Sequence, residues 1–517
     1  MNGNSPRHPD RVEEYIEAVD RYQPSHLQSH EDEFRLFARY MSRSLDARYL
    51  ERHPIEELLP ELEHLMKCSL SRQENEIKVN ISVHDDGTNR RGVLSVCIHD
   101  RSFLISTVRQ TLDTFDVQSF RSISCVMPVR RGTTGEISAV GSVDGIDELV
   151  LWIEIEAEKL SERKQELTDV IRHRLSLACT SVESYPQMRA QVEKLADQFV
   201  HLATLSETQK SLHESNAEFL RWLLDDHFVF LGTHFVPLPD APKQDWPSIG
   251  VSLAPRNSNQ LESQYIENEF FFEGPKAPYV TIRKSNSESW IYRPGLTDRV
   301  IAWTHNEHGL ATGLFVLEGL FSFQALAEPK TSIPLLDGIL EKLFSQLQAT
   351  RGSHRHRTIR NAFNSLPLEY LFSLQLENIR KLVEQLLDVD KQTRLQVNIT
   401  RDDEQGYAFV FITLPRPHYS DELRADIRRR LKASFKARSV DDGVYAGGAE
   451  SVAVHYFLTS TTNIDTQEEG TLLEEIDQLS RPWRERLHDE LSKHFDTAEA
   501  HRLHACYSSA FPRRYRE

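Results

Sequence analysis

The segment Asp225-Asp226-His227 puts two carboxylates beside an imidazole, the group types that general acid–base catalysis uses. Before it, apolar side chains recur at helical spacing; after it, a short apolar run predicts a buried strand that ends at Gly232. Ser215, followed three residues later by Glu218, predicts a capping box at the start of that helix. Because the three residues fall between a helix and a strand, we favour turn and cap chemistry over catalysis.

Two groups of histidines have spacings that metal sites also use. His354 and His356 are two residues apart, so on a strand they would share a face. His501 and His504 share a helical face, and Cys506 follows them. No Cys or carboxylate trio accompanies the first pair, and an amphipathic helix accounts for the second group. We therefore predict a solvated loop and a surface helix, with no metal site.

Sequence motifs for cofactor chemistry are missing. A dinucleotide fold needs a glycine-rich turn, G-x-G-x-x-G, between a strand and a helix. The pair Gly447-Gly448 lacks that spacing and follows no strand that the pattern predicts. The sequence also has no G-x-x-x-x-G-K-[ST] loop and no G-x-S-x-G elbow. We predict no catalytic residue, no metal and no cofactor in this chain.

The composition is that of an ordinary soluble globular protein, with 39% hydrophobic and 27% charged residues. A length of 517 residues predicts several domains. The formal charge of −17 argues against a nucleic-acid partner, whose binding rests on neutralised phosphates. Five scattered cysteines, no long apolar run and no apolar signal segment predict a cytoplasmic protein that contacts no membrane.

The hydrophobic period changes along the chain and predicts alternating helices and strands. Residues 77–83 alternate apolar and polar, as a half-buried strand does, and a turn at 85–89 leads to a second strand. Ser102 is the predicted N-cap of the helix that follows. Strands at 120–129 and 149–155 and a helix at 161–177 follow. Together these elements predict a two-layer α+β sandwich.

The middle of the chain predicts a helix followed by a meander of strands. Tyr185-Pro186 is expected to break the preceding helix. Residues 279–283 and 290–292 predict a hairpin around a turn at 284–288. Near the C-terminus, a hairpin at 395–414, a helix at 427–435 and a strand at 452–458 predict a second sandwich.

Several motifs, in order, resemble the N-terminal region of the large bacterial NAD-specific glutamate dehydrogenases. The stretch from Phe219 to Gly232, FLRWLLDDHFVFLG, resembles the family's "FLRWL-DDHF-FLG". Further matches begin at Ser102 (SFLISTVRQTL), Val280 (VTIRKSNSESWIYRP), Gly319 (GLFS) and Leu414 (LPRPHYSDELR). The resemblance implies an α+β multidomain chain, in which two ACT-like α/β sandwiches flank a PAS-like unit with helical connectors. The predicted domains are a helical lead-in (1–70), a first ACT-like domain (71–182), a helical connector with the PAS-like domain (183–330), a helical connector (331–389), a second ACT-like domain (390–462) and a helical tail (463–517).

The resemblance also implies a candidate effector site. In ACT-like units the effector binds beside the loop between the first strand and the first helix, which here is His99-Asp100-Arg101-Ser102. Free amides at the start of a helix suit the carboxylate of an amino acid. A plain N-cap with a surface ion pair is the alternative. Ser106 stands where the family carries an aspartate, so that residue's role cannot be carried over.

The family's catalytic region would lie downstream of these motifs, so we expect a non-catalytic regulatory or assembly region. NAD would then be bound by a domain outside this chain. One alternative is the required half of a split NAD-dependent glutamate dehydrogenase, and another is a stand-alone small-molecule sensor. The expected partners are a second copy of the chain or a catalytic glutamate dehydrogenase chain, with an amino acid as effector.

Overall fold

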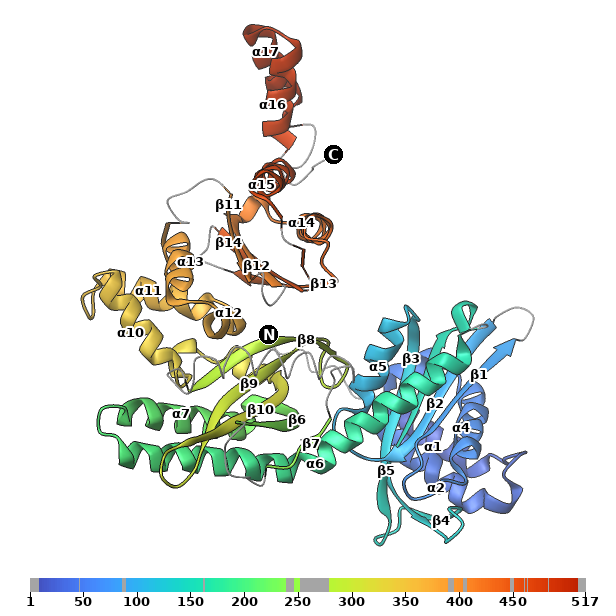
Figure 1. Cartoon of the computed structure of the whole chain (residues 1–517). Helices are drawn as coiled ribbons and strands as arrows, with labels where there is room; N and C mark the ends of the chain where they lie inside the picture. Colours follow the sequence, from blue (N-terminus) through green and yellow to red (C-terminus); the bar gives the residue numbers. More distant parts are fainter. Residues whose placement is uncertain are drawn as a thin grey trace. The chain divides into compact units, whose positions relative to one another are not determined.

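The chain divides into two compact units, which are described separately below (Figure 1). The first comprises residues 1–185 and 289–294, and the second comprises 186–288 and 295–517. The coordinates are a computed structural model, which describes residues 9–45, 47–85, 90–160, 163–238, 246–251, 279–388, 395–402, 407–446, 451–459, 461–462, 464–481 and 483–509.

The first unit contains a sheet of order β1-β2-β5-β3-β4, antiparallel throughout. Its strands are β1 (Lys78–Asp85), β2 (Arg90–His99), β3 (Ser119–Arg131), β4 (Ile137–Val140) and β5 (Ile146–Glu156). The predicted strands of this region are present, and β4 is an addition that the sequence pattern did not predict. The turn predicted at 85–89 lies almost entirely outside the described residues.

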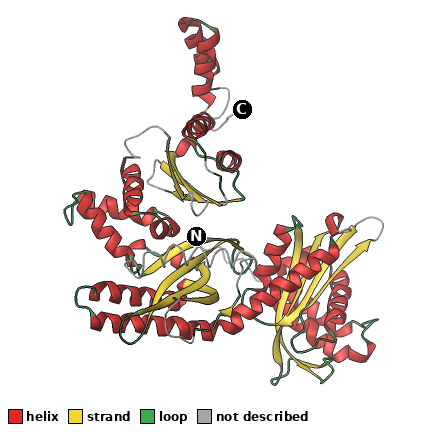
Figure 2. Cartoon of the chain, in the orientation of Figure 1, coloured by secondary structure: helices red, strands yellow, loops and turns green. Residues whose placement is uncertain are grey.

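Helices cover both faces of this sheet (Figure 2). One face shares a core with the helices α1 (Pro9–Arg21), α2 (Glu31–Met41), α3 (Ala47–Arg52) and α4 (Ile55–Ser69). The other face carries α5 (Leu104–Thr114) and α6 (Lys164–Leu205) (Figure 1). Because both faces are covered, the inner strand β2 is buried from Val93 to Ile98 and does not alternate regularly between buried and exposed residues.

The predicted break at Tyr185-Pro186 is wrong. Helix α6 runs for 42 residues with Pro186 in its interior. Buried apolar side chains continue on both sides of the proline, among them Leu175 and Val192. Tertiary packing of this apolar stripe compensates for the hydrogen bond that a proline cannot donate. Pro186 also lies where the chain passes from the first unit to the second.

The second unit begins with a sheet of order β7-β6-β10-β9-β8. Its strands are β6 (Phe228–Pro237), β7 (Ile249–Gly250), β8 (Val280–Ser289), β9 (Gly295–His305) and β10 (Ala311–Phe321). The hairpin predicted around 284–288 is wrong, because β8 runs through those residues. The predicted strand end at Gly232 is also wrong: β6 continues to Pro237, and the bare Cα of Gly232 lets the chain around Val251 approach closely.

The predicted capping box is also wrong. Helix α7 spans Lys210–Trp222, so Ser215 and Glu218 lie in its interior, and Gln209 is the N-cap. The helix leads into one wide turn, Leu223–His227, in which Asp226 has a φ of 57°. That left-handed residue turns the chain from the helix into β6. Asp225-Asp226-His227 thus lie in a helix-to-strand turn, as the pattern predicts.

A third sheet, of order β11-β12-β14-β13, repeats the connectivity of the first. Its strands are β11 (Gln396–Asp402), β12 (Tyr407–Pro415), β13 (Ser439–Ala446) and β14 (Ser451–Thr459), with α14 (Asp421–Ser434) after β12 and α15 (Thr466–Ser480) after β14. In both sheets a hairpin is followed by a helix, then by the far side of the sheet (β3 and β4 in the first sheet, β13 alone in the third), then by the strand that joins the two sides, and then by a second helix. The sequence pattern did not predict β13.

The second face of this third sheet is covered by the helical connector. Tyr370 of α12 (Leu368–Ser373) packs edge-to-face against Phe409, with the ring centroids 4.4 Å apart, and its hydroxyl donates to the carbonyl of Val410. Gln385 of α13 (Leu376–Asp388) donates to Thr413 Oγ1. The remaining helices are α9 (Phe323–Ala327), α10 (Leu336–Gln346), α11 (His354–Ser365), α16 (Trp483–His494) and α17 (Thr497–Tyr507). Each repeated sandwich therefore has its second sheet face closed by helices that precede it in the chain.

Candidate functional site

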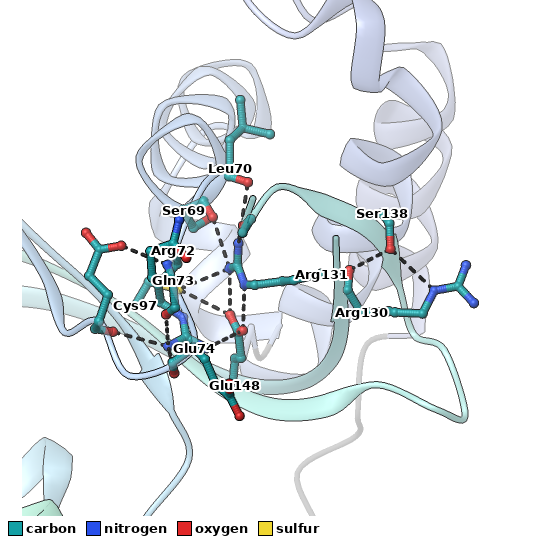
Figure 3. A network of polar contacts seen from close by, with 12 residues as sticks. Ser69, Leu70, Arg72, Gln73, Glu74, Cys97, Arg130, Arg131, Ser138 and Glu148 are labelled. Carbon is teal, nitrogen blue, oxygen red and sulfur yellow. Dashed lines mark hydrogen bonds and ion pairs between the residues drawn. The ribbon is translucent and has the colours of Figure 1, made fainter. Parts of the chain in front are cut away.

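A buried ionic network ties three segments of the first unit together (Figure 3). Glu148 of β5 accepts hydrogen bonds from Arg72 Nη2 at 2.6 Å and from Arg131 Nε and Nη2 at 2.7 Å each. The side chains of Arg72 and Glu148 are 1% and 2% exposed. Arg72 follows α4, Arg131 ends β3, and Glu148 lies near the start of β5, so no stretch of the sequence brings them together.

The two guanidinium groups also organise the backbone around them. Arg72 Nη1 donates to the carbonyls of Gln73, Glu74 and Glu76, and so holds the chain between α4 and β1. Arg131 donates to the carbonyls of Ser69, Leu70 and Gly135. These bonds offset the large cost of removing both charges from water.

The network contains two permanent cations and one carboxylate. Burial alone would raise the pKa of Glu148, but hydrogen bonds from Arg131 and Arg72 outweigh it and lower that pKa to about 2. Cys97 Sγ lies 3.4 Å from Glu148 Oε2, and burial followed by the charge of Glu148 raises the pKa of this thiol to about 12. Cys97 is therefore a neutral thiol at physiological pH and no nucleophile, and the network keeps a net positive charge.

A cleft of about 1060 Å³ lies against this network. Helix α4 contributes Lys67 and Ser69, β1 contributes Lys78, and β2 contributes Ser95 and Cys97. Helix α6, which lies on the other face of the sheet, contributes Asp169, Arg172, His173 and Ser176 to the lining. Its volume suits a small organic molecule.

The predicted effector loop, His99-Asp100-Arg101-Ser102, leads from β2 to α5. The amide of Asp100 donates to the Asp147 carbonyl, and Arg101 donates to the Asp100 carbonyl and to Glu183 Oε1 at 3.4 Å. Burial, followed by the charge of Asp147, raises the pKa of Asp100. Burial and then the charge of Arg72 lower the pKa of His99.

The predicted N-cap role of Ser102 is wrong. Helix α5 begins at Leu104, and its N-cap is Phe103, which has a φ of 73° and provides no side-chain acceptor. The left-handed turn at Phe103 moves the helix start one residue beyond the position that Ser102 would cap. Ser106 donates its hydroxyl to the Phe103 carbonyl instead.

His227 has a packing role at the helix-to-strand turn. Its Nδ1 donates to the Trp222 carbonyl at 2.8 Å, its Nε2 lies 2.9 Å from Glu328 Oε1, and its ring stacks on Trp222 at 4.3 Å. These contacts join the turn to the end of α9. They agree with turn chemistry rather than catalysis.

The histidine groups also take structural places. His354 and His356 lie on α11, not in a loop, and Ser353 caps that helix. His356 is buried and stacks on Phe344 at 3.9 Å, because its aromatic ring fills the gap between α10 and α11. His501 and His504 lie on α17, as predicted. Among the described residues, no group of three or more His, Cys, Asp or Glu side chains is arranged to hold a metal ion.

The glycine pair Gly447-Gly448, which lacks the spacing of a dinucleotide-binding turn, lies outside the described residues. The described element before this pair is β13, contrary to our expectation that no strand precedes it, and the next described element is the strand β14. The full sequence has no G-x-G-x-x-G that would present helix amides to a pyrophosphate. Within the described part of the chain, no helix is both long and apolar enough to cross a membrane.

The two repeated sandwiches define the class of this protein. Residues 37–171 match the family model described as "Glutamate dehydrogenase, ACT1 domain", and residues 396–484 match "Glutamate dehydrogenase, ACT2 domain". The chain is therefore a multidomain α+β protein in which two regions match ACT-domain models of glutamate dehydrogenase.

Two curated relatives make the similarity more specific. The NAD-specific glutamate dehydrogenase of Halomonas elongata is 22% identical over 443 residues, which cover 82% of this chain and 27% of the relative. That of Pseudomonas aeruginosa is 21% identical over 482 residues, which cover 88% of this chain and 29% of the relative. The resemblance predicted from the motifs is confirmed. The chain spans less than a third of the length of these relatives.

Proposed function

We propose that this chain is a regulatory or assembly region of an NAD-specific glutamate dehydrogenase system and does not itself carry the redox chemistry. The observation that supports this most strongly is the pair of ACT domains, which match the first and second ACT models of glutamate dehydrogenase in that order. The missing glycine-rich turn supports the non-catalytic part of the proposal. The middle sheet with its preceding helices is the proposed PAS-like unit.

The test of the non-catalytic part is direct. We expect the purified chain to show no saturable NAD binding by calorimetry and no glutamate-dependent formation of NADH. Saturable NAD binding, or activity of the chain alone, would overturn this part of the proposal.

A second test separates regulation from the split-enzyme alternative. The chain, carrying an affinity tag, is added to a separately purified catalytic chain of an NAD-specific glutamate dehydrogenase, and both association and turnover are measured. A regulatory region changes a rate that the catalytic chain already shows. A required half of a split enzyme produces activity where neither chain has any. Absence of association would favour a stand-alone sensor.

An amino-acid effector is proposed for the loop His99–Ser102. Arg101 can engage a carboxylate, and the acidic neighbours Asp100 and Asp147 suit an ammonium group. Thermal-shift measurements with the twenty amino acids, repeated on Arg101→Ala, test this assignment. Stabilisation that survives the substitution unchanged places the ligand elsewhere, and no stabilisation by any amino acid removes the effector role.

A further inference from the structure

We propose that the cleft between α4, β1 and α6 binds a small dianionic molecule, whose charged groups are carboxylates or phosphate. This assignment is separate from the effector loop, and it does not rest on the proposed function. It rests on an unpartnered buried hydroxyl, on the charges that line the cleft and on the buried network behind it.

The first observation is Ser95 of β2, which lines the cleft. It is 4% exposed, and within the described part of the chain its Oγ has no hydrogen-bond partner. Its cross-strand neighbour is Asn80, whose amide donates to Cys68 Sγ instead. A buried hydroxyl without a partner costs free energy, so its presence beside a cavity indicates that a ligand completes the hydrogen bond.

The second observation is the charge of the cleft. Among the described residues, neither Lys67 nor Lys78 has an ion-pair partner. Of the acidic lining residues, Asp169 pairs with Arg172 at 2.8 Å, and the Glu76 carboxylate accepts from the backbone amide of Gln73 and keeps its charge. Two ammonium groups are therefore free to contact an anion.

The buried network adds to this positive field. The two positive charges of Arg72 and Arg131 exceed the single negative charge of Glu148. Ser69, whose carbonyl Arg131 holds, and Cys97, whose thiol lies beside Glu148, both line the cleft. Charges behind a low-dielectric wall are screened less than surface charges, so the excess cation favours an anion in the cleft.

Two negative charges match the excess of cations: Lys67 and Lys78 against Glu76 in the lining, and Arg72 and Arg131 against Glu148 behind it. A monoanion would leave part of this charge unbalanced. Carboxylates and phosphates share the necessary acceptor oxygens, and the volume of the cleft accommodates either.

The test titrates the full-length chain by calorimetry with three probes: succinate, inorganic phosphate and neutral succinamide. We expect saturable binding of succinate or phosphate, weakened by raised ionic strength, and no binding of succinamide. The anion that binds more tightly shows whether the cleft prefers a carboxylate or a phosphate ligand. No saturable binding of either anion would overturn the proposal.

Variants locate the site. We expect Lys67→Met and Lys78→Met each to weaken binding about tenfold or more, since each removes a charge-assisted contact. The matched control is Lys164→Met, which removes an exposed ammonium on α6 that does not line the cleft. If all three variants weaken anion binding equally, the binding depends only on the overall charge of the chain, and the assignment is wrong.

Two more variants test the hydroxyl of Ser95 and distinguish the cleft from the effector loop. Ser95→Ala should weaken anion binding while leaving the melting temperature of the ligand-free protein unchanged or higher, because it removes an unpartnered buried hydroxyl. A lower melting temperature with unchanged binding would contradict the role of Ser95. Arg101→Ala should leave anion binding unchanged, and loss of binding in this variant alone would place the anion at the effector loop.

Discussion

At the scale of single residues, Glu148 sets the electrostatics of the first unit. It is the carboxylate between two buried guanidinium groups, and its own burial makes a partnerless charge there very costly. The pKa of Glu148, lowered to about 2, means that the folded state holds this carboxylate ionised well below the usual range. The network therefore stabilises the fold at every pH above the ordinary pKa of a glutamate, and this contribution declines as the pH falls toward about 2.

Glu148→Gln tests this network. We expect it to destabilise the first unit by about 3–5 kcal/mol at neutral pH, because it leaves Arg72 and Arg131 buried without a counter-charge. The stability of the wild-type first unit should fall as the pH drops from the ordinary glutamate pKa of 4.5 to about 2. The variant should lack the part of this fall that comes from protonation of Glu148. Hydrogen exchange of peptides covering β5, followed by mass spectrometry at several pH values, measures both effects. The control is the exposed Glu158→Gln, and equal behaviour of the two variants would contradict the prediction.

His227→Phe tests the turn that follows α7. Phenylalanine keeps a ring for stacking on Trp222 but removes the hydrogen bonds to the Trp222 carbonyl and to Glu328. We expect a loss of about 1.5–3 kcal/mol of local stability, the value of a hydrogen bond to a charged group. Faster amide exchange in β6 would report it, compared with the exposed control His308→Phe. Unchanged exchange would show that stacking alone holds this turn.

At the scale of elements, the long helix α6 contains a proline where the sequence predicts a break. Pro186 cannot donate to the carbonyl four residues earlier, and its ring crowds that turn. The helix persists because buried side chains on both sides of the proline pack against their own units. The tendency of a proline to break a helix is thus outweighed here by the packing of buried side chains of α6.

Pro186→Ala should therefore stabilise the middle of α6. The substitution restores a backbone donor at an exposed position, and we expect a gain of up to about 3 kcal/mol in local stability. Slower hydrogen exchange of peptides covering residues 182–190 would confirm it. The neighbouring exposed Gln187→Ala is the control. A loss of stability instead would show that the proline itself is required by the packing around it.

At the scale of the whole molecule, the two ACT domains share one plan. In each, a two-layer sandwich leaves one sheet face open, and helices that precede it in the chain close that face. The lead-in and the connector are therefore parts of the packed domains rather than spacers. Within the described residues, the outer strands β1, β11 and β13 each pair with only one neighbouring strand of their sheet, and such edges can pair with another chain.

We expect the chain to self-associate, and the exposed Val444 on the outer strand β13 is a test position. Sedimentation at micromolar concentration should show a dimer or larger species, and Val444→Lys should weaken it by about tenfold by placing a charge at the edge. Val143→Lys changes an equally apolar, fully exposed residue in the loop between β4 and β5 and is the matched control. A monodisperse monomer of the wild-type chain would contradict the prediction.

The sequence by itself determined some of the elements and their order, but not all of them. Strict alternation at 77–83 predicts β1, because one buried face imposes its period on the chain. The motif order from residue 102 to residue 424 was enough to indicate glutamate dehydrogenase relatives. The expected positions of the ACT sandwiches followed from that order.

Only the tertiary structure decided the caps, the helix through Pro186, the added strands and the cleft. Capping at Ser102 and Ser215 failed because local hydrogen bonds of about 1 kcal/mol are overruled when packing moves a helix start. Arg72, Arg131 and Glu148 carry no sequence signal, since they are separated by up to 76 residues and belong to different elements. Their meeting, and the orphaned hydroxyl of Ser95 nearby, exist only once the sheet has formed between its two layers of helices.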